Sequence, residues 1–173
     1  MSIGVTAGDE PLALLGGTFD PVHYGHLRCG EQARRELKLE YLYLLPAGQP
    51  PHRGEPQASV AQRLAMLALA RTEFPRLLID ERETRRAGPS YMVDTLQELR
   101  DTDPERPLLL LIGQDAANQL HSWHRWRRLF ELAHIVILTR PAAHIEYEPD
   151  LAAQVGLRAV DDVRKLSASR AGG

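Results

Sequence analysis

Short apolar runs alternate with longer amphipathic stretches along most of this sequence, and that alternation constrains the fold more than any other feature. Apolar runs of this length, bounded by turn residues, are typical of strands buried on both faces of a sheet. Because amphipathic helices are expected between them, the pattern predicts an α/β fold, a parallel sheet with helices on both faces. Strands are expected over residues 12–15, 41–45, 77–79, 108–112 and 135–138, and helices over residues 25–39, 59–74, 93–100 and 126–132.

The length and composition favour one globular domain. A chain of 173 residues, 43% hydrophobic and 25% charged, can bury a core but is too short for two full-sized catalytic domains. Residues 1–10 are polar and are expected to form a loose tail. The formal charge of −2 gives no general attraction to nucleic acid, and no second basic cluster extends the aromatic and basic string at residues 121–128 into a groove. An anionic ligand therefore needs a local site.

Cysteine usage and the N-terminal residues both predict a cytoplasmic protein. Cys29 is the only cysteine, so we expect neither an internal disulfide nor a cysteine-rich zinc site. The first residues lack the basic start and apolar stretch of a secretory signal, and no apolar run approaches the ~20 residues of a membrane span. We expect no membrane partner.

The second expected helix and the loop before it have clear local signals. Ser59 and Gln62 have the spacing of a capping box at the helix start. Residues 48–57 are rich in glycine and proline and are expected to form a surface loop after the second strand. One helix face is apolar and is expected to pack on the core, namely Val60, Leu64, Leu67 and Ala68.

The segment after the first expected strand carries the strongest functional signal. In an open parallel sheet, ligands bind at the carboxyl ends of the strands, near the point where the strand order reverses. Gly16 and Gly17 allow close approach of the backbone, and Thr18 adds a hydroxyl. His23 and His26 are three residues apart, so both rings can lie at the N-terminal end of the next helix, where free N–H groups favour phosphate.

This pattern is neither GxGxxG nor GxxxxGKS/T, so it predicts neither the dinucleotide fingerprint nor the ATPase loop. The alternative is a plain strand–turn–helix corner. In that case the glycines serve only the turn, and the histidines are capping or surface residues.

The string GGTFDPVHYGHL at residues 16–27 resembles the GxFDPxHxGH signature of the HxGH nucleotidyltransferase superfamily. Later segments resemble, in order, those of bacterial nicotinate-nucleotide adenylyltransferases. They are LPAGQPPHR at residues 45–53, PSYMVDTL at 89–96, LIGQD at 111–115 followed by Trp123, and IVILTRP at 135–141. The resemblance implies a Rossmann-like sheet. It also implies transfer of AMP from ATP to nicotinic acid mononucleotide, giving deamido-NAD and pyrophosphate in NAD biosynthesis.

The resemblance places the first motif on the ATP side of the site. His23, His26 and Thr18 are implied as catalytic groups that contact the triphosphate. A Mg²⁺ ion is expected through the ATP phosphates, and Asp20 is either a group near that ion or a turn former. Asp115 either accepts a hydrogen bond from a ribose hydroxyl or caps the following helix. The implied ATP-binding residues are Gly16, Gly17, Thr18, Phe19, His23, His26, Gly113 and Asp115.

The later motifs imply the nicotinate-nucleotide side. Trp123 resembles the family's stacking residue, and a core tryptophan at a helix start is the alternative. Backbone N–H groups near Met92, where the family usually has threonine, and near His124 are implied donors to the nicotinate carboxylate. His52 and Arg53 either sit over the nucleotide phosphate or form an exposed loop pair. The implied residues are His52, Arg53, Ser90, Tyr91, Met92, Trp123 and His124.

The resemblance weakens after the fifth expected strand. The family continues to an SSTxxR or SATxxR motif that holds ATP phosphates, whereas LSASR at residues 166–170 is a shortened echo of it. Residues 142–173 are therefore expected to be a divergent or truncated part of a single nucleotidyltransferase domain. Arg170 replaces the family arginine only if the terminal residues fold back to His26. A non-catalytic nucleotide-binding protein is thus the alternative function, and an enzyme like phosphopantetheine adenylyltransferase is a further one.

Overall fold

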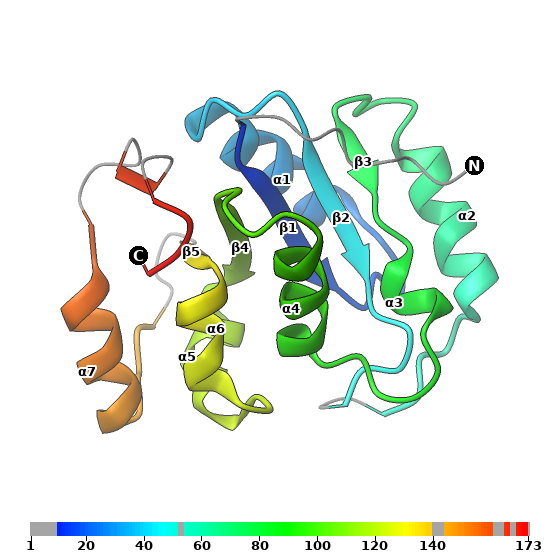
Figure 1. The fold of residues 1–173 in the computed structure, drawn as a ribbon. Coiled ribbons are helices and arrows are strands. Elements are labelled where there is room, and N and C mark those ends of the chain that lie inside the picture. Colours follow the sequence, from blue (N-terminus) through cyan, green and yellow to red (C-terminus); the bar gives the residue numbers. More distant parts are fainter. Residues whose placement is uncertain (1–9, 52–53, 140–143, 161–164, 167–168, 173) are drawn as a thin grey trace.

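The computed structural model describes residues 10–51, 54–139, 144–160, 165–166 and 169–172. Its centre is a parallel five-stranded sheet in the order β3-β2-β1-β4-β5 (Figure 1). The chain builds outward from β1 through β2 and β3, then returns to the other side of β1 for β4 and β5. The strand order therefore reverses between β1 and β4. The strands are β1 Leu12–Gly17, β2 Leu42–Pro46, β3 Leu77–Ile79, β4 Leu108–Gly113 and β5 His134–Leu138.

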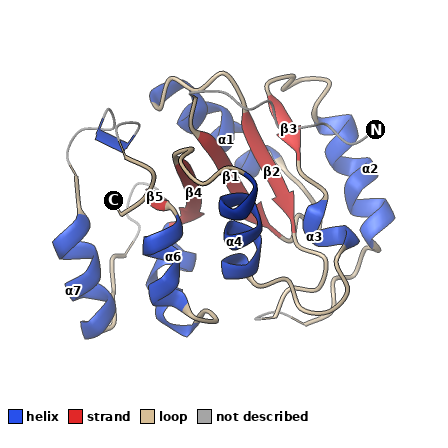
Figure 2. Cartoon of the chain, viewed as in Figure 1, coloured by secondary structure: helices blue, strands red, loops and turns tan. Residues whose placement is uncertain are grey.

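Helices cover both faces of this sheet, because alternate side chains of each buried strand point to opposite faces. Leu14 and Leu110 belong to an apolar cluster that includes residues of α4 and α6. Leu15 and Leu44 belong to a second cluster with residues of α1 and α2. Figure 2 shows α4 in front of the strands and α1 behind them. The helices are α1 Tyr24–Glu36, α2 Val60–Ala70, α3 Arg82–Arg85, α4 Met92–Thr102, α5 Gln114–Asn118, the 3-10 helix η1 Leu120–Ser122, α6 Trp126–Leu132 and α7 Pro149–Arg158.

The expected α/β architecture is confirmed, together with all five expected strands and all four expected helices. Strand bounds differ from the expected ones by at most two residues, whereas α1 and α2 end three and four residues early. The elements α3, α5, η1 and α7 were not expected. The first three have three to five residues, which is too few for an apolar period to be recognised.

The start of α2 has the expected capping box, but the expected buried face is partly wrong. The Ser59 hydroxyl accepts a hydrogen bond from the Gln62 amide at 3.3 Å. Leu67 is buried as expected, whereas Ala68 is exposed. Arg63, one helical turn before Leu67, is buried instead. A charged side chain therefore occupies a position that apolar patterning could not assign to the core.

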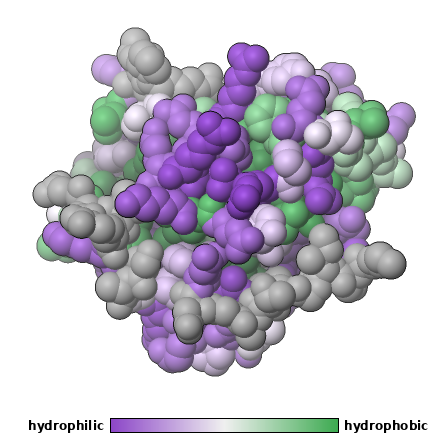
Figure 3. Space-filling view, turned by 90° about the horizontal axis from the view of Figure 1, so that it is seen from above, coloured by the Kyte–Doolittle hydropathy of each residue, from purple (hydrophilic) through white to green (hydrophobic). Residues whose placement is uncertain are grey.

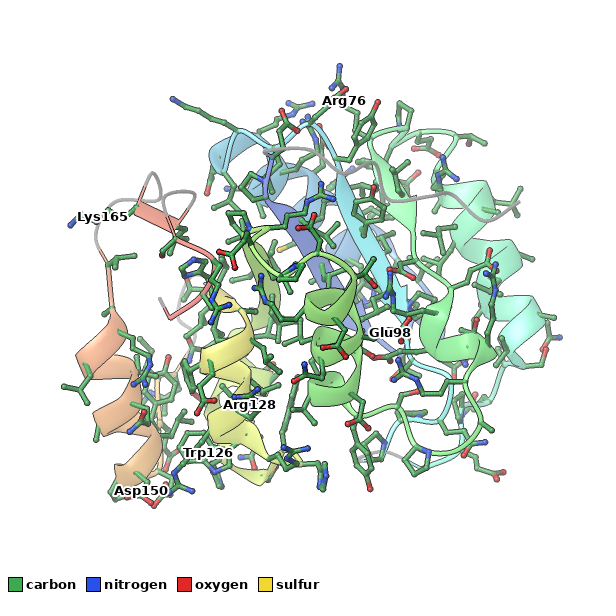
Figure 4. All side chains as sticks on the ribbon, viewed as in Figure 1. Arg76, Glu98, Trp126, Arg128, Asp150 and Lys165 are labelled. Atoms are coloured by element: carbon green, nitrogen blue, oxygen red, sulfur yellow. The ribbon has the colours of Figure 1, made fainter. Side chains whose placement is uncertain are left out.

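Beyond β5, the described residues include the helix α7. The N-terminal ends of α6 and α7 lie near each other, and Figure 4 shows Trp126 and Asp150 side by side there. Arg127, next to that tryptophan, forms an ion pair of 2.5 Å with Asp150. None of the helices within the described ranges is long and apolar enough to cross a membrane.

Ser169 and Arg170 lie at the end of the sheet where the strands begin. The Ser169 carbonyl oxygen is 2.7 Å from Nε2 of His134, the first residue of β5. The Arg170 carbonyl oxygen accepts a hydrogen bond from the amide of Leu108, the first residue of β4, at 3.3 Å. Figure 3, which looks down on this end from above, shows hydrophilic side chains over much of it. We call it the amino end of the sheet.

Candidate active site

A cavity of about 360 Å³ opens at the other end of the sheet, where the strands finish. Because it is lined by residues that end β1 and β4, it lies at the point where the strand order reverses, the position where open parallel sheets bind ligands. We call it the switch-point cavity. Its described lining includes Gly16, Gly17 and Thr18 after β1, Gly113 and Asp115 after β4, and Ser90, Tyr91, Met92, Trp123 and His124.

Of two further implied ATP-binding residues, Asp115 lines the cavity and Phe19 does not. Phe19 is 2% exposed and has a φ of 51°, in the left-handed region, so any contact with a ligand here would use its backbone. Asp115 does line the cavity and is exposed. The capping alternative for Asp115 is wrong, because the N-cap of α5 is Gly113.

His23 and His26 form a stacked pair at the start of α1. Their ring centroids are 3.8 Å apart and the ring planes differ by 23°. His23 is the N-cap residue, and its backbone N–H donates to Nδ1 of His26 at 3.4 Å. The rings thus lie together at the N-terminus of a 13-residue helix, where backbone N–H groups and the helix dipole favour an anion.

The glycine between the two histidines has a physical reason. A Cβ atom at Gly25 would lie 2.9 Å from both Cε1 and Nδ1 of the His23 ring. Any larger residue would therefore push that ring off His26. Neither ring is in the described lining of the switch-point cavity, which ends on this side at Thr18. The histidine pair therefore forms a separate patch next to the cavity, at the same end of the sheet.

Ser90 joins the segment before α4 to the loop after β2. Its hydroxyl oxygen accepts hydrogen bonds from the backbone N–H groups of Gly48 at 2.9 Å and Gln49 at 3.1 Å. The Ser90 backbone N–H donates in return to the Gln49 carbonyl at 2.9 Å. A Cβ atom at position 48 would lie 2.3 Å from the backbone oxygen of Glu83, so only glycine fits there. The loop after β2 is thus held on two sides.

The remaining residues implied for the nicotinate nucleotide are brought together from two segments. The Tyr91 and His124 rings lie 4.4 Å apart at 31°. Trp123 is half-buried, lines the cavity and packs against the apolar cluster that contains the buried Trp126. Met92 is the first residue of α4, and its amide has no acceptor within the helix. His52 and Arg53 lie outside the described residues.

Comparisons with known proteins show which family the chain belongs to. The family model for cytidylyltransferase-like proteins matches residues 14–169. A relative from Methylococcus capsulatus, named a probable nicotinate-nucleotide adenylyltransferase, is 50% identical over 158 residues, covering 91% of this chain and 75% of the relative. One from Dechloromonas aromatica with the same name is 47% identical over 168 residues, covering 95% and 77%. The chain belongs to the nicotinate-nucleotide adenylyltransferase family.

Solved structures agree on the fold of this family member. Plasmodium falciparum nicotinic acid mononucleotide adenylyltransferase complexed with NaAD matches with a TM-score of 0.71 at 14% identity, covering 83% of this chain and 70% of that one. A putative nicotinate-nucleotide adenylyltransferase from Vibrio parahaemolyticus matches with a TM-score of 0.62 at 12% identity, covering 91% of both chains. At such identities the likeness shows the Rossmann-like fold alone.

In this adenylyltransferase family member, sequence reasoning missed a buried carboxyl at the cavity wall. Glu83 on α3 is 2% exposed and lines the cavity, and the Thr95 hydroxyl donates to its Oε1 at 2.6 Å. Burial raises the pKa of Glu83 above its ordinary range. Around it, Glu98 of α4 points toward α3 (Figure 4) and forms ion pairs with Arg82 at 3.1 Å and Arg86 at 2.5 Å. A lone glutamate in a polar segment gives no sequence signal of such burial.

Arg63 was missed as well, because apolar patterning does not assign a charged residue to the core. It is 1% exposed, and its guanidinium donates to backbone carbonyl oxygens at the ends of β1 and β2. Burial lowers the pKa of this arginine, against the opposing attraction of the Asp20 carboxylate. Asp20 itself accepts hydrogen bonds from the amides of Gln57 at 2.6 Å and Ala58 at 3.0 Å. Its role is thus to fasten two loops.

Proposed function

We propose that this protein transfers AMP from ATP to nicotinic acid mononucleotide, giving deamido-NAD and pyrophosphate in NAD biosynthesis. The observation that carries the proposal is the placement of a stacked histidine pair and an open cavity side by side at the carboxyl ends of β1 and β4. Relatives 50% and 47% identical carry the name of this activity. ATP and NAD are intracellular metabolites, so the proposal includes a cytoplasmic location.

The chemistry asks mainly for positioning and charge neutralisation. The second pKa of a phosphate monoester is about 6, so the attacking phosphate is largely a dianion at neutral pH and needs no general base. Negative charge gathers on the bridging oxygen as pyrophosphate leaves, and donors aimed at it stabilise the transition state. His23, His26 and the N-terminus of α1 would supply those donors, with Thr18 and the backbone of Gly17 beside them.

The cavity would hold the nicotinate nucleotide. Trp123 offers an aromatic face to the flat pyridine ring, and the first amide of α4, at Met92, offers a donor to the ring carboxylate. An amide substrate would present NH₂ to that donor and leave both unpaired, so the acid is the better ligand. The contact between the tilted Tyr91 and His124 rings keeps the two donor segments together.

Magnesium would enter with ATP as part of the substrate. Among the described residues, no group of three or more histidine, cysteine, aspartate or glutamate side chains could hold a metal ion. Each Asp20 carboxylate oxygen accepts one backbone N–H group. We expect Mg²⁺ to be held chiefly by the ATP phosphates, where it neutralises their charge.

A non-catalytic nucleotide-binding protein is the second candidate, and one observation favours it. The Arg170 carbonyl bonds at the amino end of the sheet, so this arginine does not supply an ATP contact near His26. A pyrophosphate-release assay with ATP, Mg²⁺ and either nicotinic acid mononucleotide or its amide separates the candidates. The enzyme releases pyrophosphate and prefers the acid. A binder takes up the mononucleotide in titration calorimetry without releasing pyrophosphate.

A further inference from the structure

The most deeply buried charge among the described residues lies directly behind the candidate site. Arg63 is on the face of α2 that packs toward the sheet, and it is 1% exposed. An unpaired buried guanidinium would be strongly destabilising, so its donors need partners. The partners that it finds are backbone oxygens of the two loops that flank the site.

The contacts join two different strands. Nη1 of Arg63 donates to the carbonyl oxygens of Thr18 and Ala47, each at 2.8 Å, and Nη2 donates to that of Gly48 at 3.3 Å. Thr18 follows β1, and the other two residues follow β2. One planar side chain therefore fixes the loop after β1 against the loop after β2.

These contacts also decide which backbone groups face the ligand. Thr18 and Ala47 line the switch-point cavity, whereas Arg63 does not. Because their carbonyl oxygens are turned to the guanidinium behind them, those negative dipoles are directed away from a site proposed for polyanions. Asp20 strengthens the arrangement, since its carboxylate binds the two amides just before the Ser59 cap of α2.

We propose that Arg63 is a positioning residue that sets the loop holding ATP against the loop holding the mononucleotide. The inference rests on the proposed function, in which the loop after β1 serves the triphosphate and the loop after β2 serves the nucleotide phosphate. Each loop can still bind its own substrate when this link is weakened. What is lost is the alignment of the attacking phosphate with the α-phosphate, and a misplacement of 1 Å can cost about 100-fold in rate.

The chain offers a matched control in Arg100 on α4. This arginine is also buried, at 7% exposed, and its guanidinium donates to the carbonyl oxygens of Pro104, Arg106, Leu132 and Arg170. All four contacts lie at the amino end of the sheet, away from the cavity. The substitutions Arg63→Lys and Arg100→Lys remove the same planar donor set and keep the charge, so their comparison separates positioning from a general loss of stability.

The experiment measures kcat, both KM values and Tm for the two variants and the parent. We expect Arg63→Lys to lower kcat about 10- to 100-fold with each KM within about threefold, and Arg100→Lys to lower Tm with kcat within about twofold. Equal kcat losses in the two variants, or an unchanged kcat in Arg63→Lys, would overturn the proposal.

Deuterium exchange gives a readout that does not depend on the reaction. In Arg63→Lys, amides of residues 16–20 and 47–49 should exchange faster than in the parent, and in Arg100→Lys they should not. If the parent releases no pyrophosphate, the proposed function fails, and the exchange result alone decides whether Arg63 links the two loops. Unchanged exchange in both loops would refute that link.

Discussion

Each end of the sheet has a buried arginine that holds neighbouring loops, and the carboxyl end also has the switch-point cavity. At each end, one buried arginine gathers backbone carbonyl oxygens of neighbouring loops, Arg63 where the strands finish and Arg100 where they begin. Burial lowers the pKa of both. At the carboxyl end the arginine stands behind a cavity, a histidine pair and a helix N-terminus. Both arginines hold loops in place, so a buried arginine by itself does not indicate a functional site. The two ends differ in the groups that lie beside the fixed loops.

The comparison also explains the C-terminal motif. Ser169 and Arg170 have the hydroxyl and guanidinium expected of an ATP-side element. Both nevertheless use backbone oxygens to close the amino end, where they meet His134, Leu108 and Arg100. Ser169 and Arg170 thus resemble an ATP-binding motif in residue type, but they lie at the amino end of the sheet and have a structural role there.

The largest expected effect at the carboxyl end is that of the histidine pair. His26→Ala should lower kcat at least about 100-fold, because a preorganised donor aimed at developing charge is lost. The control is His134→Ala at the amino end, which removes a buried ring that contacts the Ser169 carbonyl. It should lower Tm while keeping kcat within about twofold. Steady-state pyrophosphate release measures kcat of both variants. A His26→Ala variant as active as the parent would contradict the expected difference between the two ends.

Ser90→Ala should have the next largest effect. The change leaves the Gly48 and Gln49 amides without their hydroxyl acceptor, which costs about 1–3 kcal/mol and loosens the loop after β2. We expect KM for the mononucleotide to rise about tenfold and KM for ATP to change by less than about twofold. A rise confined to ATP would show that this loop serves the other substrate. Ser122→Ala is the control, since its hydroxyl donates to the Gln119 carbonyl of its own segment at 2.7 Å.

Sequence reasoning recovered the fold because a parallel sheet leaves a strong pattern. Each buried strand is a short apolar run, as in residues 108–112, and the helices between them follow their own period. It also located the carboxyl end of β1, because a glycine turn followed by two spaced histidines is a local signal that can be recognised without tertiary contacts.

The rest of the site depends on contacts that are distant in sequence. Arg63 lies 45 residues from Thr18, and Glu83 lies 12 residues from Thr95, so no local pattern reveals either contact. The buried face of α2 was wrong in part because Ala68 is exposed while a charged residue is buried. The position of Arg170 is set by Leu108 and Arg100, which a short terminal string cannot predict.

The pH dependence of stability should differ in sign between the ends. At the carboxyl end, burial raises the pKa of Glu83, so the folded protein holds this proton more tightly than the unfolded chain. The contribution of protonated Glu83 to the free energy of unfolding is fully present below the ordinary carboxyl pKa. It is lost as the pH rises through the raised pKa. Glu83→Gln should therefore gain a few degrees of Tm on the parent between pH 5 and pH 8. Thermal melts at both values test this, and a constant difference would contradict it.

Toward the amino end, Glu31 on α1 should behave in the opposite way. Its hydrogen bond with Arg34, which also binds the Leu39 carbonyl just before β2, lowers the pKa of Glu31 from 4.5 to about 2. The stability that it contributes is present above the ordinary value and is lost as pH falls toward 2. Glu31→Gln should have a lower Tm than the parent at pH 7 and approach it at low pH. Thermal melts at pH 7 and at low pH test this, and a variant that matched the parent at pH 7 would contradict it.

The smallest expected effect is that of Arg170→Ala. Its carbonyl oxygen, which the substitution keeps, makes the bonds that close the amino end, while its exposed guanidinium pairs only loosely with Glu105 at 3.9 Å. An exposed pair contributes about 0–1 kcal/mol, so Tm should fall by at most a few degrees. ATP affinity and kcat should stay within about twofold, because this side chain lies at the end of the sheet away from the histidine pair. Titration calorimetry with ATP measures the affinity. A tenfold loss of affinity would mean that Arg170 reaches the triphosphate, and it would contradict the separate roles of the two ends.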